Sequence, residues 1–131
     1  MIEVAAAILS DEGGSILICQ RDNTGDCAGL WEFPGGKRNK GEDWPECLAR
    51  ECREELGVLI EIGELYDEFC YAYPKRTIHF RFYRAKITSG ELCRRVHSCL
   101  VWVERKNLKD FDFCPADERL IARLSSEHER K

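Results

Sequence analysis

The segment from Gly36 to Val58, GKRNKGEDWPECLARECREELGV, constrains the fold of this 131-residue chain more than any other. Asp43 is a good helix N-cap, and Glu46 three residues later completes a capping box. Gly57 is expected in the left-handed conformation that ends a helix. The segment therefore predicts a helix from about Trp44 to Leu56, with a loop on either side.

The two faces of this helix differ in chemistry. At ~100° per residue, Glu51, Glu54 and Glu55 fall within an arc of roughly 100°. The adjoining arc carries the apolar or small residues Leu48, Ala49, Cys52 and Leu56. One side is therefore expected to pack in the core, while its neighbour presents three carboxylates.

Three neighbouring glutamates allow two interpretations. A run of charge is usually a solvated helix face. Like charges repel, however, and an i,i+4 pair of Arg50 with Glu54 leaves Glu51 and Glu55 without a partner. Carboxylate and carbonyl oxygens are ligands that suit Mg²⁺ or Mn²⁺. Within the whole pattern the metal site is favoured, and the expected turn at Pro34, Gly35 and Gly36 lets a backbone carbonyl approach the ion.

The chain resembles the Nudix hydrolase superfamily. The spacing of seven residues follows G-x5-E-x7-R-E-U-x-E-E-x-G-U, where U is apolar and Cys52 is the first such position: Gly36, Glu42, Arg50, Glu51, Glu54, Glu55 and Gly57. This pattern is the Nudix box, at 36–58. The runs GLWEFPGGK and FDFCPADERLIARL resemble the MutT-like branch, whose members are nucleoside triphosphate pyrophosphohydrolases. The resemblance implies one α/β domain over 1–131, a Nudix α/β/α sandwich with a mixed β-sheet and the Nudix loop-helix-loop.

The resemblance also implies a catalytic site. Its metal ligands are the Gly35 carbonyl, Glu51, Glu54 and Glu55, which hold Mg²⁺, with Mn²⁺ as a substitute. Glu51 and Glu54 are expected to do the metal and base work, with the choice between them open. Arg50 is expected to hold the carboxylates in register, and Glu42 to be an outer ligand or an orienting group.

Substrate contacts are implied at five positions. Arg21, Phe33, Arg76 and Asp117 match residues that surround the base in the MutT-like branch, and Lys37 is placed to offset phosphate charge. Each of the four has a plainer alternative: Phe33 as core, the two arginines as surface residues with buried stems, and Asp117 as a first-turn acid favoured by the helix dipole.

One position departs from the branch pattern. Relatives often carry a glutamate in the loop before the penultimate strand, as a further ligand or base, and the matching residue is Val96. His97 is a candidate replacement, but an isolated loop histidine is more often a surface residue. The identity of the general base therefore stays open.

The implied reaction is hydrolysis of a nucleoside triphosphate to a monophosphate and pyrophosphate, in housekeeping of the nucleotide pool and DNA repair. Candidate substrates are 8-oxo-dGTP or CTP, dCTP and 5-methyl-dCTP. An ionised Asp117 only accepts hydrogen bonds, and it can accept them from the N4 amino group of cytosine or from N1–H and the 2-amino group of guanine. Cytosine is preferred because the PAD sequence resembles the cytosine-tolerant, broad-specificity members of the branch. The alternatives are hydrolysis of a nucleotide sugar or dinucleotide, and a non-catalytic domain that senses nucleotides.

Composition limits the partners. A net charge of −4 argues against binding nucleic acid duplexes. No apolar run approaches ~18 residues, so the chain is expected to be cytoplasmic, without membrane contact, and a monomer or small homo-oligomer. The eight cysteines contain no C-x2-C pair and are expected to be free, mostly buried thiols rather than zinc ligands or disulfides.

Outside the 36–58 segment, the pattern predicts strands at 4–9 and 15–20 joined as a hairpin, and at 77–87 and 98–104. In the strand at 77–87, Ile78, Phe80 and Phe82 share one face. A helix is predicted from Ala116 to about Glu129.

Overall fold

The computed structural model describes residues 1–127. The elements follow in the order β1 (Ile2–Leu9), β2 (Ile16–Gln20), β3 (Trp31–Glu32), β4 (Gly35–Lys37), α1 (Trp44–Leu56), β5 (Leu59–Tyr73), β6 (Arg76–Ser89), β7 (Cys99–Val103), the 3₁₀ helix η1 (Arg105–Asp110) and α2 (Pro115–Ser126).

The strands form two sheets. The larger has the order β4-β1-β6-β5, in which β1 runs parallel to β6 from Ile2 opposite Ile78 to Leu9 opposite Ala85, and the other pairs are antiparallel. The smaller has the order β3-β2-β7 and is antiparallel. The mixed sheet predicted from the sequence is therefore confirmed, and a second sheet accompanies it.

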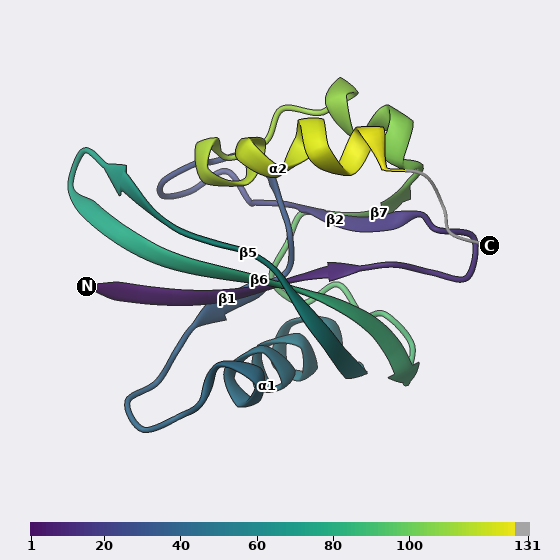
Figure 1. Ribbon diagram of the computed structural model, residues 1–131, viewed down its shortest axis with the longest axis horizontal. Helices are drawn as coiled ribbons and strands as arrows, with labels where there is room; N and C mark the ends of the chain where they lie inside the picture. The colour runs from purple at the N-terminus through teal and green to yellow at the C-terminus, as the bar shows by residue number, and fades with distance from the viewer. Residues whose placement is uncertain (128–131) are drawn as a thin grey trace.

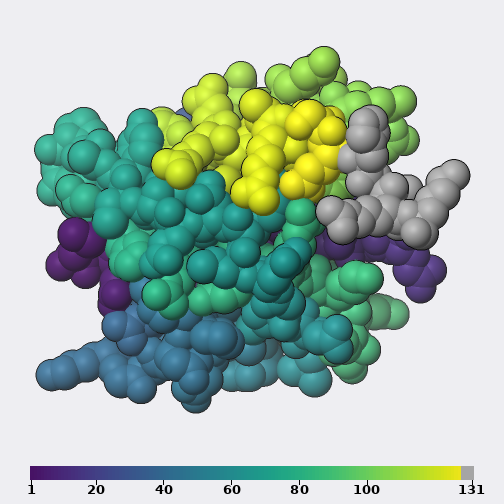
Figure 2. All heavy atoms as spheres, viewed as in Figure 1, coloured from purple at the N-terminus to yellow at the C-terminus, as the bar shows by residue number. Residues whose placement is uncertain are grey.

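Helices cover both faces of the larger sheet, with α1 on one side and α2 on the other (Figure 1). The alternation of side chains in β1 and β6 explains why both helices find an apolar surface. Phe80 and Phe82 pack in the core with α2, whereas Tyr83 and Ala85 belong to the core with α1. Figure 2 shows the same layering, with the teal atoms of β5 and β6 between the blue and yellow segments of the two helices.

Helix α1 begins and ends as the sequence predicts. The Asp43 carboxylate accepts from the backbone N–H of Glu46 at 2.8 Å, the Glu46 carboxylate accepts from the backbone N–H of Asp43 at 3.2 Å, and Gly57 is left-handed with φ 73°. Leu48, Cys52 and Leu56 are fully buried. The capping box and the buried arc are thus confirmed, and together they fix which way the glutamates face.

Three local predictions are wrong. Strands β1 and β2 belong to different sheets and share only the bridge of Ser10 with Ile16, so 4–20 is not a hairpin. The expected turn at Gly35 and Gly36 is instead strand β4, which pairs with β1. The missing side chain of Gly35 allows this pairing, because a Cβ atom there would overlap the Ala5 carbonyl oxygen. Helix α2 ends at Ser126, before the predicted end at Glu129, which lies outside the described residues.

The structure also shows the state of the cysteines and the character of the helices. All eight cysteines are free, and Cys19, Cys47, Cys52 and Cys114 are buried, as expected, while Cys70 and Cys93 are exposed. Among residues 1–127, neither helix has the length and apolar composition needed to cross a membrane.

Candidate active site

A cleft of about 690 Å³ lies between the two sheets, and the acidic face of α1 borders one end of it. Its volume lies in the range of small-molecule sites. Of the ten residues predicted for the site, eight line this cleft: Arg21, Phe33, Gly35, Lys37, Glu51, Glu55, Arg76 and Asp117. Arg50 and Glu54 do not line it. The structure therefore joins the predicted acidic and base-contacting positions in a single cavity.

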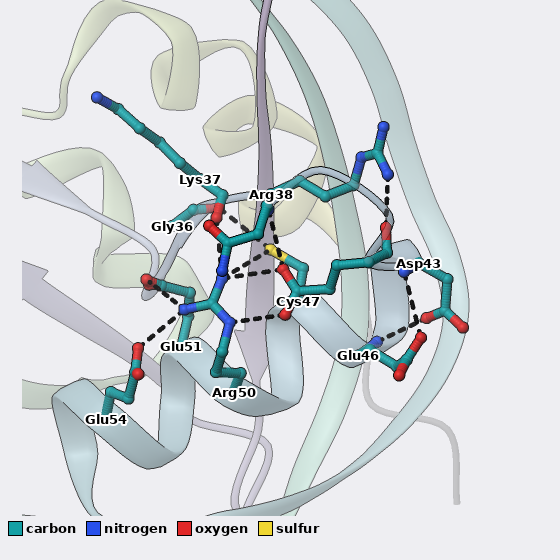
Figure 3. Close-up of polar contacts among 11 residues, drawn as sticks. Gly36, Lys37, Arg38, Asp43, Glu46, Cys47, Arg50, Glu51 and Glu54 are labelled. Atoms are coloured by element: carbon teal, nitrogen blue, oxygen red, sulfur yellow. Dashed lines mark hydrogen bonds and ion pairs between the residues drawn. The ribbon is translucent and has the colours of Figure 1, made fainter.

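Arg50 lies at the centre of the acidic end (Figure 3). Its guanidinium donates to both carboxylate oxygens of Glu42, at 2.6 and 3.0 Å, to the Glu54 carboxylate at 2.9 Å and to the Lys37 carbonyl at 3.0 Å. It also lies 3.5 Å from the Glu51 carboxylate. A planar fork suits such a multidentate role, and the predicted pair of Arg50 with Glu54 is present.

Glu42 is an anchor for that arginine. Hydrogen bonds from Arg50 and from the Asn39 backbone lower the pKa of Glu42 to about 2, and the bond to Glu42 raises the pKa of Arg50. Because Glu42 does not line the cleft, the structure favours the orienting role over that of an outer ligand.

Glu51 occupies the space that Gly36 leaves free. A Cβ atom at position 36 would overlap the Glu51 carboxyl group, so the glycine lets α1 pack against β4 with this side chain between them. Burial raises the pKa of Glu51. Its Oε2 atom is buried and has no hydrogen-bond partner among the described residues. A buried carboxylate oxygen in that state is suited to a cation or a proton.

The side chains of Glu55 and Glu54 point in different directions. Glu55 lines the cleft, and burial raises its pKa to about 7. The side chain of Glu54 is 57% exposed and turns toward Arg50. In residues 1–127 the three glutamates do not bring their oxygens together, because Arg50 attracts Glu54 while like charges repel. The structure thus places Glu51 and Glu55, but not Glu54, in the cleft.

The end of the cleft that is predicted to contact the base is built on buried aromatic residues. Phe33 is 3% exposed and stacks on Phe113 with ring centroids 5.5 Å apart, so it belongs to the core as well as to the cleft wall. Asp117 is 6% exposed at the start of α2. Burial, and then the charge of Glu32, raise the pKa of Asp117 well above its usual value. This direction favours a neutral carboxyl group, in contrast to the ionised Asp117 assumed from the sequence.

The two predicted arginines hold the loop that borders the cleft. Arg21 donates to the Asp26 carbonyl at 3.0 Å and to the Glu32 carboxylate at 3.1 Å. Arg76, at the start of β6, pairs with the Asp26 carboxylate at 2.9 Å. Both guanidinium groups therefore lie on the cleft and fix the segment between β2 and β3.

Sequence reasoning missed or misplaced three cleft residues. His97 is 4% exposed rather than a surface residue, with Nε2 2.9 Å from the Glu32 carboxylate and Nδ1 buried without a partner among the described residues. Glu32 binds both His97 and Arg21, and Tyr73 lines the base end. Of these three residues, only Glu32 had a signal in the sequence, which is its position next to Phe33. His97 and Tyr73 had no signal, because their burial depends on the smaller sheet and on the long strand β5.

A carboxylate-bearing helix at one end of a nucleotide-sized cleft is an arrangement suited to metal-assisted hydrolysis. Residues 4–123 match the family model described as the NUDIX domain. The chain belongs to this family and is a pyrophosphohydrolase.

Two similar relatives come from bacteria. The "8-oxo-dGTP diphosphatase" of Haemophilus influenzae is 40% identical over 127 residues, which are 97% of this chain and 93% of the relative. The "CTP pyrophosphohydrolase" of Escherichia coli is 38% identical over 121 residues, 92% of this chain and 89% of the relative.

Solved structures agree on the fold. The solution structure of the E. coli ORF135 protein has a TM-score of 0.80 and 37% identity, and the match covers 93% of this chain and 86% of that one. The MutT protein of Methanosarcina mazei Go1 has a TM-score of 0.84 at 23% identity, over 98% of this chain and 96% of that one, which supports the fold alone.

Proposed function

We propose that this enzyme is a Mg²⁺-dependent nucleoside triphosphate pyrophosphohydrolase. Water breaks the anhydride between the α- and β-phosphorus atoms, and the products are a nucleoside monophosphate and pyrophosphate. Relatives whose names specify 8-oxo-dGTP and CTP support a nucleotide substrate. Removal of modified or excess nucleotides is the corresponding role in the cell.

The residues present fit a divalent metal, which Nudix hydrolases generally use. Glu51 has a buried oxygen without a hydrogen-bond partner in residues 1–127, burial and then the charge of Glu51 raise the pKa of Glu55, and both glutamates line the cleft with Gly35. We assign the ion to Glu51, Glu55 and the Gly35 carbonyl; Glu54, which pairs with Arg50 outside the cleft, is predicted from the sequence as a further ligand. When bound, Mg²⁺ supplies charge neutralisation on the phosphates and activation of water.

The chain's own residues complete the chemistry. Lys37 and Arg21 line the cleft and offset the negative charge of the triphosphate. Arg50 keeps Glu42, Glu51 and Glu54 in fixed positions. Glu55, with its pKa about 7, is able to hold or release a proton near neutral pH. Holding these groups rigidly lowers the reorganisation that hydrolysis requires.

The observation that carries the proposal is the continuity of the cleft. One cavity runs from Glu51 and Glu55 to the buried carboxyl of Asp117, with Phe33 in its wall. A phosphate-handling end and a polar group that can read a base therefore lie in one site. This arrangement suits a single molecule that carries both a base and a polyphosphate.

The test is a panel of nucleoside triphosphates with standard, 5-methylated and 8-oxo bases, assayed with Mg²⁺. We expect pyrophosphate and monophosphate as products, and no turnover in excess EDTA. Release of orthophosphate, or faster hydrolysis of nucleotide sugars and dinucleotides than of any triphosphate, would contradict the proposal. Tight nucleotide binding without turnover would indicate a sensing domain instead.

A further inference from the structure

Asp117 and Glu32 form a close pair of acids at the base end of the cleft. A carboxylate oxygen of each lies within 4.8 Å of the other and of the Cys114 thiol sulfur. Asp117 is 6% exposed, and the Glu32 side chain is 22% exposed. Two carboxyl groups this close and this little hydrated do not readily ionise together, so at neutral pH the pair is expected to retain one proton.

The hydrogen bonds decide which acid keeps the proton. Glu32 has a separate partner for each oxygen, since Arg21 donates to Oε1 at 3.1 Å and His97 Nε2 lies 2.9 Å from Oε2. The Arg21 contact stabilises a negative charge on Glu32, as does the His97 contact in the tautomer with a proton on Nε2. Asp117 forms no ion pair among the described residues and accepts one backbone hydrogen bond, from Phe33. The charge therefore belongs on Glu32 and the proton on Asp117.

Burial and the charge of Glu32, which raise the pKa of Asp117, outweigh the charge of Arg21 and a hydrogen bond from the Phe33 backbone, which lower it. The titratable and charged side chains that line this end of the cleft come from the loop between β2 and β3, from β3, from β5, from the loop before β7 and from the residue before α2: Arg21, Cys27, Glu32, Tyr73, His97 and Cys114. Of these, Arg21 is engaged with Glu32 and His97 is on the far side of the same carboxylate. Burial, followed by the nearby acids, also raises the pKa of the Cys114 thiol, which leaves it neutral.

We propose that Glu32 is a positioning residue for base recognition, which keeps the shared proton on Asp117 so that the base meets a neutral carboxyl group. Such a group presents one O–H donor and one C=O acceptor, as an asparagine amide does. This inference rests on the proposed function, because it specifies how the cleft reads the base of its nucleotide.

The protonation state changes which bases fit. A neutral carboxyl donates to N3 of cytosine while it accepts from the N4 amino group, and it pairs equally with O6 and N1–H of guanine. An ionised carboxylate faces the N3 lone pair of cytosine with a second acceptor, but still accepts from N1–H and the 2-amino group of guanine. The proton on Asp117 therefore permits cytosine and guanine nucleotides alike, and its loss disfavours cytosine.

The first test reads the proton directly, on the ligand-free full chain. Aspartate labelled with ¹³C at the carboxyl carbon is followed by NMR against pH, and the Asp117 signal is assigned by its loss in Asp117→Asn. We expect a neutral Asp117 at pH 7 and a midpoint at least about one unit lower in Glu32→Gln. Glu118→Gln removes an exposed charge one residue away and should keep the wild-type midpoint. An ionised Asp117 at pH 7, or equal midpoints in wild type and Glu32→Gln, overturns the inference.

The second test uses specificity, at a pH between the two midpoints. Glu32→Gln should lower the ratio of kcat/KM for CTP to that for GTP by about threefold or more, whereas the same change in an Asp117→Asn background should leave the ratio unaltered. A similar fall in both backgrounds would show a merely structural role and overturn the inference. If Glu32→Gln does not fold, the wild-type NMR titration decides alone. Absence of turnover with every triphosphate would contradict the proposed function without changing the NMR result.

Discussion

At the scale of single residues, Arg50 links the side chains that the acidic end needs. It bridges Glu42 and Glu54 and holds the Lys37 carbonyl, so one guanidinium ties the loop before α1, the helix and strand β4 together. The Glu42 contact is bidentate. A lysine in its place keeps the charge but cannot form this fork.

We therefore expect Arg50→Lys to lower kcat/KM by about tenfold or more, the usual scale for a partner that orients a site residue. The thermal midpoint should change little, because Leu48, Cys52 and Leu56 still pack. Arg53→Lys, an exposed change on the same helix, is the matched control for both measurements. Wild-type kcat/KM in Arg50→Lys would show that the fork has no role in activity.

At the scale of elements, the contact of α1 with β4 sets the position of Glu51. The carboxyl group lies where a side chain at position 36 would be. Gly36→Ala should therefore push Glu51 away from its position while the capping box still starts the helix. A displacement of about 1 Å in a site can cost ~10²-fold in rate.

The expected result for Gly36→Ala is a loss of activity of that order with near-native helical content by circular dichroism. Gly13→Ala provides the control, since a Cβ there meets only an ordinary contact 3.6 Å away. Equal kcat in Gly36→Ala and wild type would mean that Glu51 does not need this packing.

The elements also show how far the sequence leads. Helix α1 could be predicted to the residue because Asp43, Glu46 and Gly57 determine its ends locally. The 15-residue strand β5 could not be predicted in this way. The burial of its residues depends on pairing with β6, and register shifts interrupt that pairing. His97 was misplaced for a related reason: its burial follows from contact with Glu32, 65 residues away in the chain. Local signals predict local structure, and the base end of the cleft is assembled by long-range contacts.

At the scale of the whole molecule, metal binding and stability should depend on pH together. Burial raises the pKa of Glu55 to about 7 and also raises that of Glu51. A raised carboxyl pKa favours the protonated form in the folded state. The free energy of unfolding therefore falls as the pH rises from the pKa of Glu55 in the unfolded chain toward its folded pKa of about 7. A divalent cation needs the ionised form and offsets that loss.

The increase in thermal midpoint caused by Mg²⁺ should accordingly be larger at pH 8 than at pH 6. For each proton that the metal displaces, the apparent affinity for Mg²⁺ increases about tenfold with each pH unit, as long as the pH is below the pKa. Tighter binding stabilises the folded state more. Melting curves with Mg²⁺ or EDTA at each pH test this, with Glu118→Gln as a charge control. An equal or larger Mg²⁺ effect at pH 6 would contradict the assignment of the ion to Glu51 and Glu55.

The measurement that addresses the whole account most directly is kcat of Glu51→Gln on a nucleoside triphosphate at saturating Mg²⁺. Glutamine keeps the shape of Glu51 and removes the charge at its Oε2 atom, which has no hydrogen-bond partner within residues 1–127. We predict a loss of ~10²-fold or more, with pyrophosphate still the product of the residual reaction and the fold intact by circular dichroism. Retention of more than about a tenth of wild-type kcat would contradict the claim that the carboxylates of α1 carry the hydrolysis.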